Sequence, residues 1–266
     1  MPYTFGAGTG DDATWTNSNS GFTAGITVVT GWWRPTTLTA GRGLWSAGSI
    51  IGAEIDTTTT ELRLKLDNAT TDGEWTTSGL GLAVDTWRFL AFASSTVNTP
   101  GASWKVWAGT VETAPVEVTV NVAVALSGAF TGTSSFTVGN KGSAGVVAFQ
   151  GDIAEVLVVG ETASNTNSMF SNESFGSFTS NITSQIERQM VFPAWEGDYD
   201  SIARLRNGNT AVMGLYGYWS GESTTVETPF GRVVATISGA TVSQNGSPRP
   251  RPSGRPLDHG SWRRSR

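Results

Sequence analysis

The sequence contains no cysteine and only one histidine, His259, and these scarcities exclude much of protein chemistry. Without cysteine there is no disulfide, no thiolate metal site and no cysteine nucleophile. Because the histidine lies near the end of the sequence, the body of the chain cannot assemble a Ser-His-Asp triad, a histidine zinc site or a histidine general base. Lysine-, tyrosine- and carboxylate-based mechanisms stay open.

Long apolar runs and charged residues are also scarce. Nowhere do about 18 apolar residues follow one another, as a membrane helix needs, and residues 1–16 show no basic stretch before an apolar one, as an export signal would. Charged residues make up 15% of the chain, whereas glycine alone occurs 33 times. This composition is typical of short strands joined by tight turns. We therefore expect an all-β protein that is made in the cytoplasm and has no membrane contact.

Short apolar segments with the period of β-strands recur through more than half of the chain. Residues 61–66, ELRLKL, put three leucines on one face, and residues 116–126 alternate valines with other residues. Residues 21–35 and 86–94 are apolar on both faces, which predicts buried central strands. Strands at this spacing, with turn signals between them, predict a sandwich or a barrel.

The next segments predict a strand pair and then helices. Residues 134–140 and 148–160 are expected to pair across a glycine-bearing turn at 140–145. A short helix is expected at 200–206. Strands resume from Ala211.

One longer amphipathic helix is expected in residues 180–193. Ile182, Ile186 and Met190 recur at i, i+4 and i+8 behind serine and threonine cap candidates. Pro193 is expected to close this helix.

Residues 246–266 differ in charge from the rest of the chain. They hold six arginines and one aspartate, a balance of +5, which leaves −10 on residues 1–245. Four prolines and few apolar side chains predict an extended, polyproline-like arm. Charge asymmetry of this kind often marks an interaction tail. The candidate partner-binding residues are Arg249, Arg251, Arg255, Leu257, Trp262, Arg263, Arg264 and Arg266.

Three roles are open to this arm. Its arginines can neutralise the phosphates of a nucleic acid. They can also meet the carboxylates of a neighbouring subunit, with Trp262 and Leu257 as apolar anchors, or the arm can be an inert solubilising tail. The acidic body has no basic stripe, which disfavours nucleic acid, so we expect a protein partner.

The order of these segments resembles the laminin-G-like members of the concanavalin-A-like jelly-roll superfamily. The matching stretches are FTAGITVVTGWWRPT, LWSAG, ELRLKL, DTWRFLAFA, WKVWAGT and FTVGNKGSAGVVAFQGDIAEVLVVGETAS. Most telling is Phe149, followed by Gly151, Asp152 and Ile153 and then the apolar strand 155–159. The resemblance implies an all-β, two-sheet antiparallel jelly-roll sandwich with a small helical insert and an extended C-terminal arm.

The whole organisation is similar to virion proteins of tailed bacteriophages, both decoration and tail proteins. This resemblance implies a non-enzymatic structural protein of the virion: a capsid decoration or cement protein, present as a homo-oligomer and bound to other virion proteins such as the major capsid protein. The implied division is an N-terminal segment (1–20), a laminin-G-like jelly-roll core (21–162), a helical insert (163–210), late strands that complete or flank the sandwich (211–245) and the basic arm (246–266).

Eleven tryptophans raise a rival interpretation, because flat aromatic faces stack on sugar rings. Trp107, on the polar side of its strand with Lys105, and Trp75, in the polar segment TDGEWTTSG, are the candidate sugar contacts. The alternative function is thus a carbohydrate-binding module, such as a receptor-binding part or an adhesin.

A third interpretation is a glycoside hydrolase, because the superfamily includes retaining glycosidases with a Glu-x-Asp-x-Glu strand. Glu54 and Asp56 reproduce the first half of that pattern, but the run 57–60 is all threonine and the next acid is Glu61. Retaining hydrolysis needs two carboxyl groups about 5 to 5.5 Å apart. The threonines indicate a turn that sends Glu61 to another strand, so we predict a solvated hairpin and no catalytic residue.

Laminin-G-like domains often hold calcium at one rim, which makes Asp67, Asp72 and Asp152 candidate ligands. Calcium takes several oxygen ligands, and these aspartates lie in or near predicted turns. Their spacing does not match a dedicated calcium loop, so we predict turn aspartates, no metal site and no cofactor.

Overall fold

The computed structural model describes residues 3–6, 12–16, 26–48, 51–95, 104–128, 135–140, 148–160, 178–198, 201–202, 211–214, 225–228, 231–239 and 241–242. The predicted arm, with every candidate partner-binding residue from Arg249 to Arg266, lies outside this part.

The described part contains strands and one helical segment. The strands are β1 (Tyr3–Phe5), β2 (Asp12–Thr16), β3 (Ile26–Pro35), β4 (Gly43–Ala47), β5 (Ile51–Ile55), β6 (Leu62–Leu66), β7 (Gly73–Ser78), β8 (Arg88–Ser95), β9 (Trp104–Gly109), β10 (Val116–Val124), β11 (Ser135–Val138), β12 (Gly151–Gly160), β13 (Ala211–Gly214), β14 (Thr225–Thr228), β15 (Gly231–Ser238) and β16 (Thr241–Val242). The helical segment comprises α1 (Ser180–Ile186), a π-helical turn (Glu187–Val191) and α2 (Phe192–Glu196).

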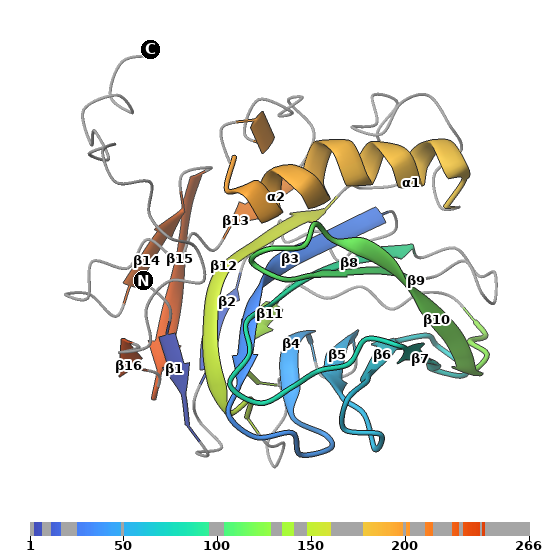
Figure 1. Ribbon diagram of the computed structural model, residues 1–266, viewed down its shortest axis with the longest axis horizontal. Coiled ribbons are helices and arrows are strands. Elements are labelled where there is room, and N and C mark those ends of the chain that lie inside the picture. Colours follow the sequence, from blue (N-terminus) through green and yellow to red (C-terminus); the bar gives the residue numbers. More distant parts are fainter. Residues whose placement is uncertain are drawn as a thin grey trace.

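The strands form two antiparallel layers (Figure 1). In sheet A the order is β9, β8, β3, β12, β1 and β16, with β13 beside the second half of β12. In sheet B it is β14, β15, β2, β11, β4, β5, β6 and β7. Strand β10 joins the layers, because its first residues pair with β9 and its later residues pair with β7. The late strands β13, β15 and β16 therefore belong to the sandwich rather than to a layer of their own.

The chain crosses between the layers at several points. Strands β2 and β3 are consecutive in sequence but lie in opposite sheets, and so do β11 and β12. Such crossings wrap a jelly roll, and the predicted two-sheet antiparallel jelly-roll sandwich is confirmed. The predicted pairing of 134–140 with 148–160 is wrong. Strand β11 pairs with β2 and β4, and β12 pairs with β1, β3 and β13.

Aromatic rings fill the space between the sheets. Trp45 of β4 stacks on Phe136 of β11 with 5.6 Å between ring centroids, and it meets Phe92 of β8 edge-on at 5.7 Å. Offset and edge-on pairs at these distances stabilise by about 0.5 to 1.5 kcal/mol beyond their buried area. Because Phe92 comes from sheet A and the other two rings from sheet B, these contacts join the layers.

The helical segment covers the outer face of sheet A (Figure 1). The predicted inward face is confirmed, since Ile182, Ile186 and Met190 are buried against the same cluster as Trp32 and Trp107. Sheet A is therefore apolar on both faces, which explains why strand β3 is buried along almost its whole length. None of the helices in the described part is long and apolar enough to span a bilayer.

Two indole N–H groups fix this helical segment to the sheet. Trp107 Nε1 donates to Glu187 Oε1 over 2.8 Å, and Trp195 Nε1 donates to the Thr110 carbonyl over 2.8 Å. Each bond satisfies a polar atom that the packing would otherwise leave without water.

The helical segment begins as predicted but ends later. Thr179 caps it by accepting a hydrogen bond from the Ile182 N–H at 3.2 Å. Pro193 does not close it, because the wider π-helical turn 187–191 precedes the proline and leaves room for its ring, which would clash in a regular α-helix. The end comes at Gly197, which takes the left-handed conformation of a helix stop.

Only the start of the second predicted helix is described. Ser201 and Ile202 are helical, and the Asp198 carboxylate caps them by accepting the Ser201 N–H at 3.1 Å. The rest of 200–206 lies outside the described residues.

Strand β10 exists as predicted, but its valines are less buried than the alternating pattern suggests. Val116 is 65% exposed, Val122 41% and Val124 42%, and only Val118 and Val120 pack against the core. Period alone shows which residues share a face. It does not show whether another layer covers that face, and at the junction between the sheets the cover is incomplete.

Two glycines with left-handed backbone allow a prediction about this fold. A Cβ on Gly151 would lie 2.1 Å from the Arg34 carbonyl oxygen, whereas a Cβ on Gly79 would meet nothing within 4 Å. We expect Gly151→Ala to lower the free energy of unfolding by about 3 kcal/mol or more through strain and overlap, and Gly79→Ala by about 1 kcal/mol through strain alone. Urea unfolding of both variants measures the difference, and equal losses would contradict the register of β12 against β3.

Candidate functional site

The outer face of sheet B carries a row of charged side chains across β5, β6 and β7. In β6 the leucines pack in the core between the sheets, so Arg63 and Lys65 project from the opposite face. In the strand register Glu54 lies opposite Arg63, and Lys65 lies opposite Glu74. Acids and bases on neighbouring strands therefore face one another, which stabilises a sheet.

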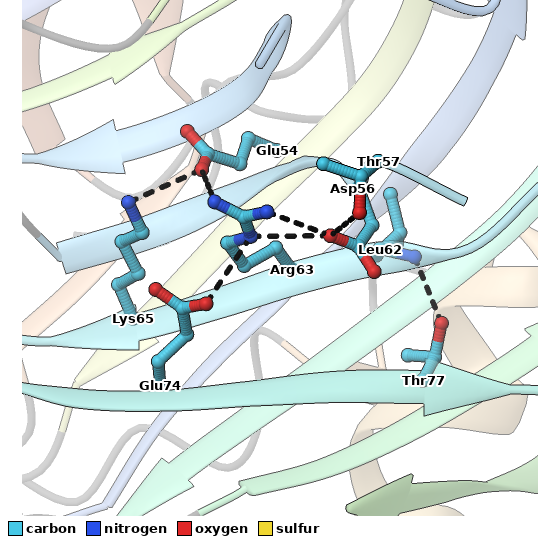
Figure 2. Close-up of polar contacts among 8 residues, drawn as sticks. All are labelled: Glu54, Asp56, Thr57, Leu62, Arg63, Lys65, Glu74 and Thr77. Carbon is cyan, nitrogen blue, oxygen red and sulfur yellow. Dashed lines mark hydrogen bonds and ion pairs between the residues drawn. The ribbon is translucent and has the colours of Figure 1, made fainter. Parts of the chain in front are cut away.

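Arg63 is at the centre of this group (Figure 2). Its Nη2 lies 3.0 Å from Asp56 Oδ1, its Nε 3.3 Å from Glu74 Oε1, and its Nη1 3.8 Å from Glu54 Oε1. Lys65 Nζ lies 3.2 Å from Glu54 Oε1. These five residues are called the Arg63 network below.

Attraction between opposite charges in the Arg63 network outweighs the cost of burying them. Burial alone would lower the pKa of Arg63, but the hydrogen bond with Asp56 and the charges of Glu74, Asp56 and Glu54 outweigh it and raise that pKa. Glu54 and Asp56 are 5% and 7% exposed, while the side chains of Arg63, Lys65 and Glu74 keep between 21% and 28% of their surface open. The predicted solvated hairpin is thus wrong for its two acids, which are buried and paired.

As the sequence predicts, a turn separates Glu61 from the strand of Glu54 and Asp56, and it brings Glu61 to the residue before β6, where its carbonyl accepts the Asp56 N–H at 3.0 Å. Its carboxylate accepts the Thr77 hydroxyl at 2.7 Å and the N–H groups of Gly79 and Leu80 at 3.0 and 3.1 Å. It thereby closes the turn after β7. The strand that carries Glu54 and Asp56 therefore lacks the third acid of a Glu-x-Asp-x-Glu pattern, and the Glu61 carboxylate is engaged at the turn after β7.

The two tryptophans predicted to contact sugar are buried. Trp75 lies opposite Leu64 in the register, so its ring enters the core and is 1% exposed. Trp107 is 0% exposed beneath the helical segment. Neither ring offers a face to a sugar. The prediction for Trp107 failed because Lys105 lies on the same side of β9 and made that side look solvated, whereas a helix covers it.

The structure places one of the three candidate calcium ligands, Asp152, apart from the other two. Asp152 is fully buried and accepts Arg34 Nε at 2.7 Å and a bond from Thr4. Asp67 and Asp72 lie near each other, and burial together with the Asp72 carboxyl raises the pKa of Asp67. Among the described residues no group of three or more His, Cys, Asp or Glu side chains could hold a metal ion.

The Arg63 network was missed at the sequence level, although part of its signal was visible. The alternation in ELRLKL already placed Arg63 and Lys65 on a face of their own. What the sequence did not provide is the register that sets Glu54 against Arg63, because register depends on the length and type of the turn.

No protein-family model and no curated protein matches the sequence. Solved structures do. The chain is similar to a putative carbohydrate binding protein from Bacteroides ovatus, with 15% identity and a TM-score of 0.49 over 90% of this chain and 59% of that one. It is similar to tailspike protein 2 of an Escherichia coli O157:H7 bacteriophage, with 16% identity and a TM-score of 0.44 over 72% of this chain and 26% of that one. A heptameric SAP-like pentraxin from Limulus polyphemus shares 13% identity with a TM-score of 0.41, over 59% of this chain and 74% of that one.

Breaking the Arg63 network should destabilise the fold. Arg63→Met leaves Lys65 as the only cation of the Arg63 network. Removing one partner of a buried pair costs about 3 to 5 kcal/mol, reduced here to about 2 kcal/mol because Arg63 is partly exposed. Lys105→Met is the matched control, since its pair with Glu117 is exposed and should contribute less than about 1 kcal/mol. Chemical unfolding at pH 7 compares the two, and similar losses would show that the network is not buried.

The raised pKa of Asp67 predicts a pH dependence. A carboxyl whose pKa is higher in the folded than in the unfolded state binds protons more tightly when folded, so its ionisation weakens the fold above the folded pKa. Asp67→Asn should therefore stabilise the protein at pH 7, by less than about 1 kcal/mol for a partly exposed pair. The difference should vanish as the pH falls through the ordinary aspartate range. Thermal melting at pH 7 and pH 3.5 tests this, and destabilisation at pH 7 would refute it.

Proposed function

We propose that this chain is a non-enzymatic carbohydrate-binding module whose ligand lies on the outer face of sheet B. The supporting observation is the Arg63 network, in which fixed donors and acceptors alternate across three adjacent strands. The described helical segment packs on the outer face of sheet A and not on this face of sheet B (Figure 1).

The chemistry of a glycan matches such a row. Each sugar hydroxyl both donates and accepts hydrogen bonds, so a surface with cations and carboxylates side by side offers partners for both. Ion pairing holds Arg63, Lys65 and Glu74 in place before any ligand arrives. Side chains that are already ordered lose less entropy on binding.

Hydrolysis is not part of this proposal. Glu54 and Asp56 each meet cationic nitrogen within 3.2 Å, so neither is arranged as a free acid or nucleophile. A retaining glycosidase needs one carboxyl that gives up a proton and another that attacks. The Arg63 network supports binding without turnover.

A second candidate is an assembly role, such as capsid decoration. The observation that favours it is the exposed valines of β10, because exposed apolar residues gathered on one strand often mark a protein interface. This role and the basic arm would fit a virion protein held in place by its neighbours. It predicts association through Val116, Val122 and Val124 rather than through the Arg63 network.

Titration with neutral and acidic oligosaccharides separates the two candidates. If the module binds sugar through the network, Lys65→Gln should weaken the affinity at least tenfold, because it replaces a charged donor of the face with a shorter, neutral amide while Arg63 still pairs the buried acids. Lys105→Gln, in an exposed pair on β9, is the control and should bind like the unmodified chain.

Three measurements complete the test. Release of reducing ends from any bound polysaccharide would refute the absence of turnover. Sugar binding that survives Lys65→Gln would move the site to another face. The absence of sugar binding, together with self-association or particle binding that Val122→Ser and Val124→Ser abolish, would favour the assembly role.

A further inference from the structure

Arg42 is a buried cation that makes no ion pair with any described residue. It is 9% exposed and lies at the entry to β4, where the Arg42 carbonyl accepts the Ile55 N–H at 2.9 Å. Its Nη1 donates to the Ala148 carbonyl over 2.7 Å, and its Nε is buried without a hydrogen-bond partner. A guanidinium has five N–H donors, and among the described residues only the Ala148 carbonyl accepts one of them.

The other buried charges of the described residues are all compensated. Glu54 and Asp56 pair with cations of the Arg63 network, and Asp152 pairs with Arg34. Arg42 stands apart, because burial lowers its pKa and no carboxylate offsets that effect. Isolated buried charge is costly, and proteins normally pair it or bind it to an ion.

The turn that leads into Arg42 is open to solvent. The turn before it is short, and its residues Thr39 and Ala40 are exposed. Next to Arg42, Gly41 has a left-handed φ of +79°, and a Cβ placed there would meet nothing within 4 Å. This open space lies beside the Gly41 backbone, at the residue before Arg42. A small group can therefore approach the turn at Gly41 without displacing a packed side chain.

We propose that Arg42 receives an oxyanion, a carboxylate or a sulfate, carried by an acidic glycan. The planar fork of a guanidinium matches such groups with two parallel hydrogen bonds. The choice of a glycan as carrier rests on the proposed function, whereas the anion site itself rests on Arg42 alone. This site would make the module selective for acidic over neutral sugars.

The test uses the full chain and two kinds of probe. Thermal melting compares sodium sulfate with sodium chloride at equal ionic strength, and calorimetry compares a hexuronate oligosaccharide with its carboxyl-reduced, neutral counterpart. Arg42→Met and Arg42→Lys are the variants. Arg188→Met is the control, because Arg188 is exposed on the helical segment and its Nε donates to the Ser184 carbonyl.

We expect sulfate to raise the melting temperature more than chloride does, and the hexuronate to bind at least tenfold more tightly than its neutral counterpart. Arg42→Met should lose both effects, Arg42→Lys should keep part of them, and Arg188→Met should keep them in full. Without any oxyanion, Arg42→Met should melt at the same or a higher temperature, because it removes an uncompensated charge. A structural arginine would behave in the opposite way.

Four results would overturn parts of the inference in distinguishable ways. Indifference to sulfate together with a lower melting temperature of Arg42→Met would show that Arg42 is structural only. Equal affinity for acidic and neutral sugars, unchanged in Arg42→Met, would refute the site and leave the proposed function standing. Stabilisation by sulfate through Arg42 with no binding of any sugar would refute the proposed function and leave the anion site. Stabilisation by sulfate with binding of neutral sugar only would identify an adventitious ion only.

Discussion

The two-residue period of a β-strand decides what the outer face of sheet B can carry. Leu62, Leu64 and Leu66 each bury their side chains between the sheets, where apolar burial supplies most of the driving force for folding. Once those leucines point inward, Arg63 and Lys65 have no other direction than outward. The charged face is thus a consequence of the core, and a shift of register by one residue would exchange the two faces.

The sequence predicts well whatever depends on period, and less well whatever depends on neighbours. The alternation in β6 and the doubly buried β3 follow directly from apolar spacing. The covering of Trp107 does not, because the helix that buries it comes some 80 residues later, as the separation from Glu187 shows. The alternating pattern does not predict the exposure of Val122, for the converse reason. Strand β10 alternates like a covered strand but lies at the junction of two layers.

Burial of charge has different outcomes at two places in this fold. At Arg63, cations and acids from three adjacent strands enter the low-dielectric region together, so each desolvation cost is offset by an attraction that the same region strengthens. At Arg42 the cost is present without the offset. Proteins keep such unfavourable local features mainly at functional sites. The unpaired Arg42 is therefore more informative about function than the paired charges.

Among the described residues no exposed aromatic ring is available to strengthen the binding proposed for the outer face. In the described part the exposed large hydrophobic residues are all valines, so no tryptophan or tyrosine there adds stacking energy to the hydrogen bonds. A neutral hydrogen bond contributes only about 0.5 to 1.5 kcal/mol net, and a bond to a charged group about 1.5 to 3 kcal/mol. A face of this kind gains useful affinity when several copies act together, because linked sites multiply weak binding. Glycan binding and assembly through β10 are therefore compatible, and the second would strengthen the first.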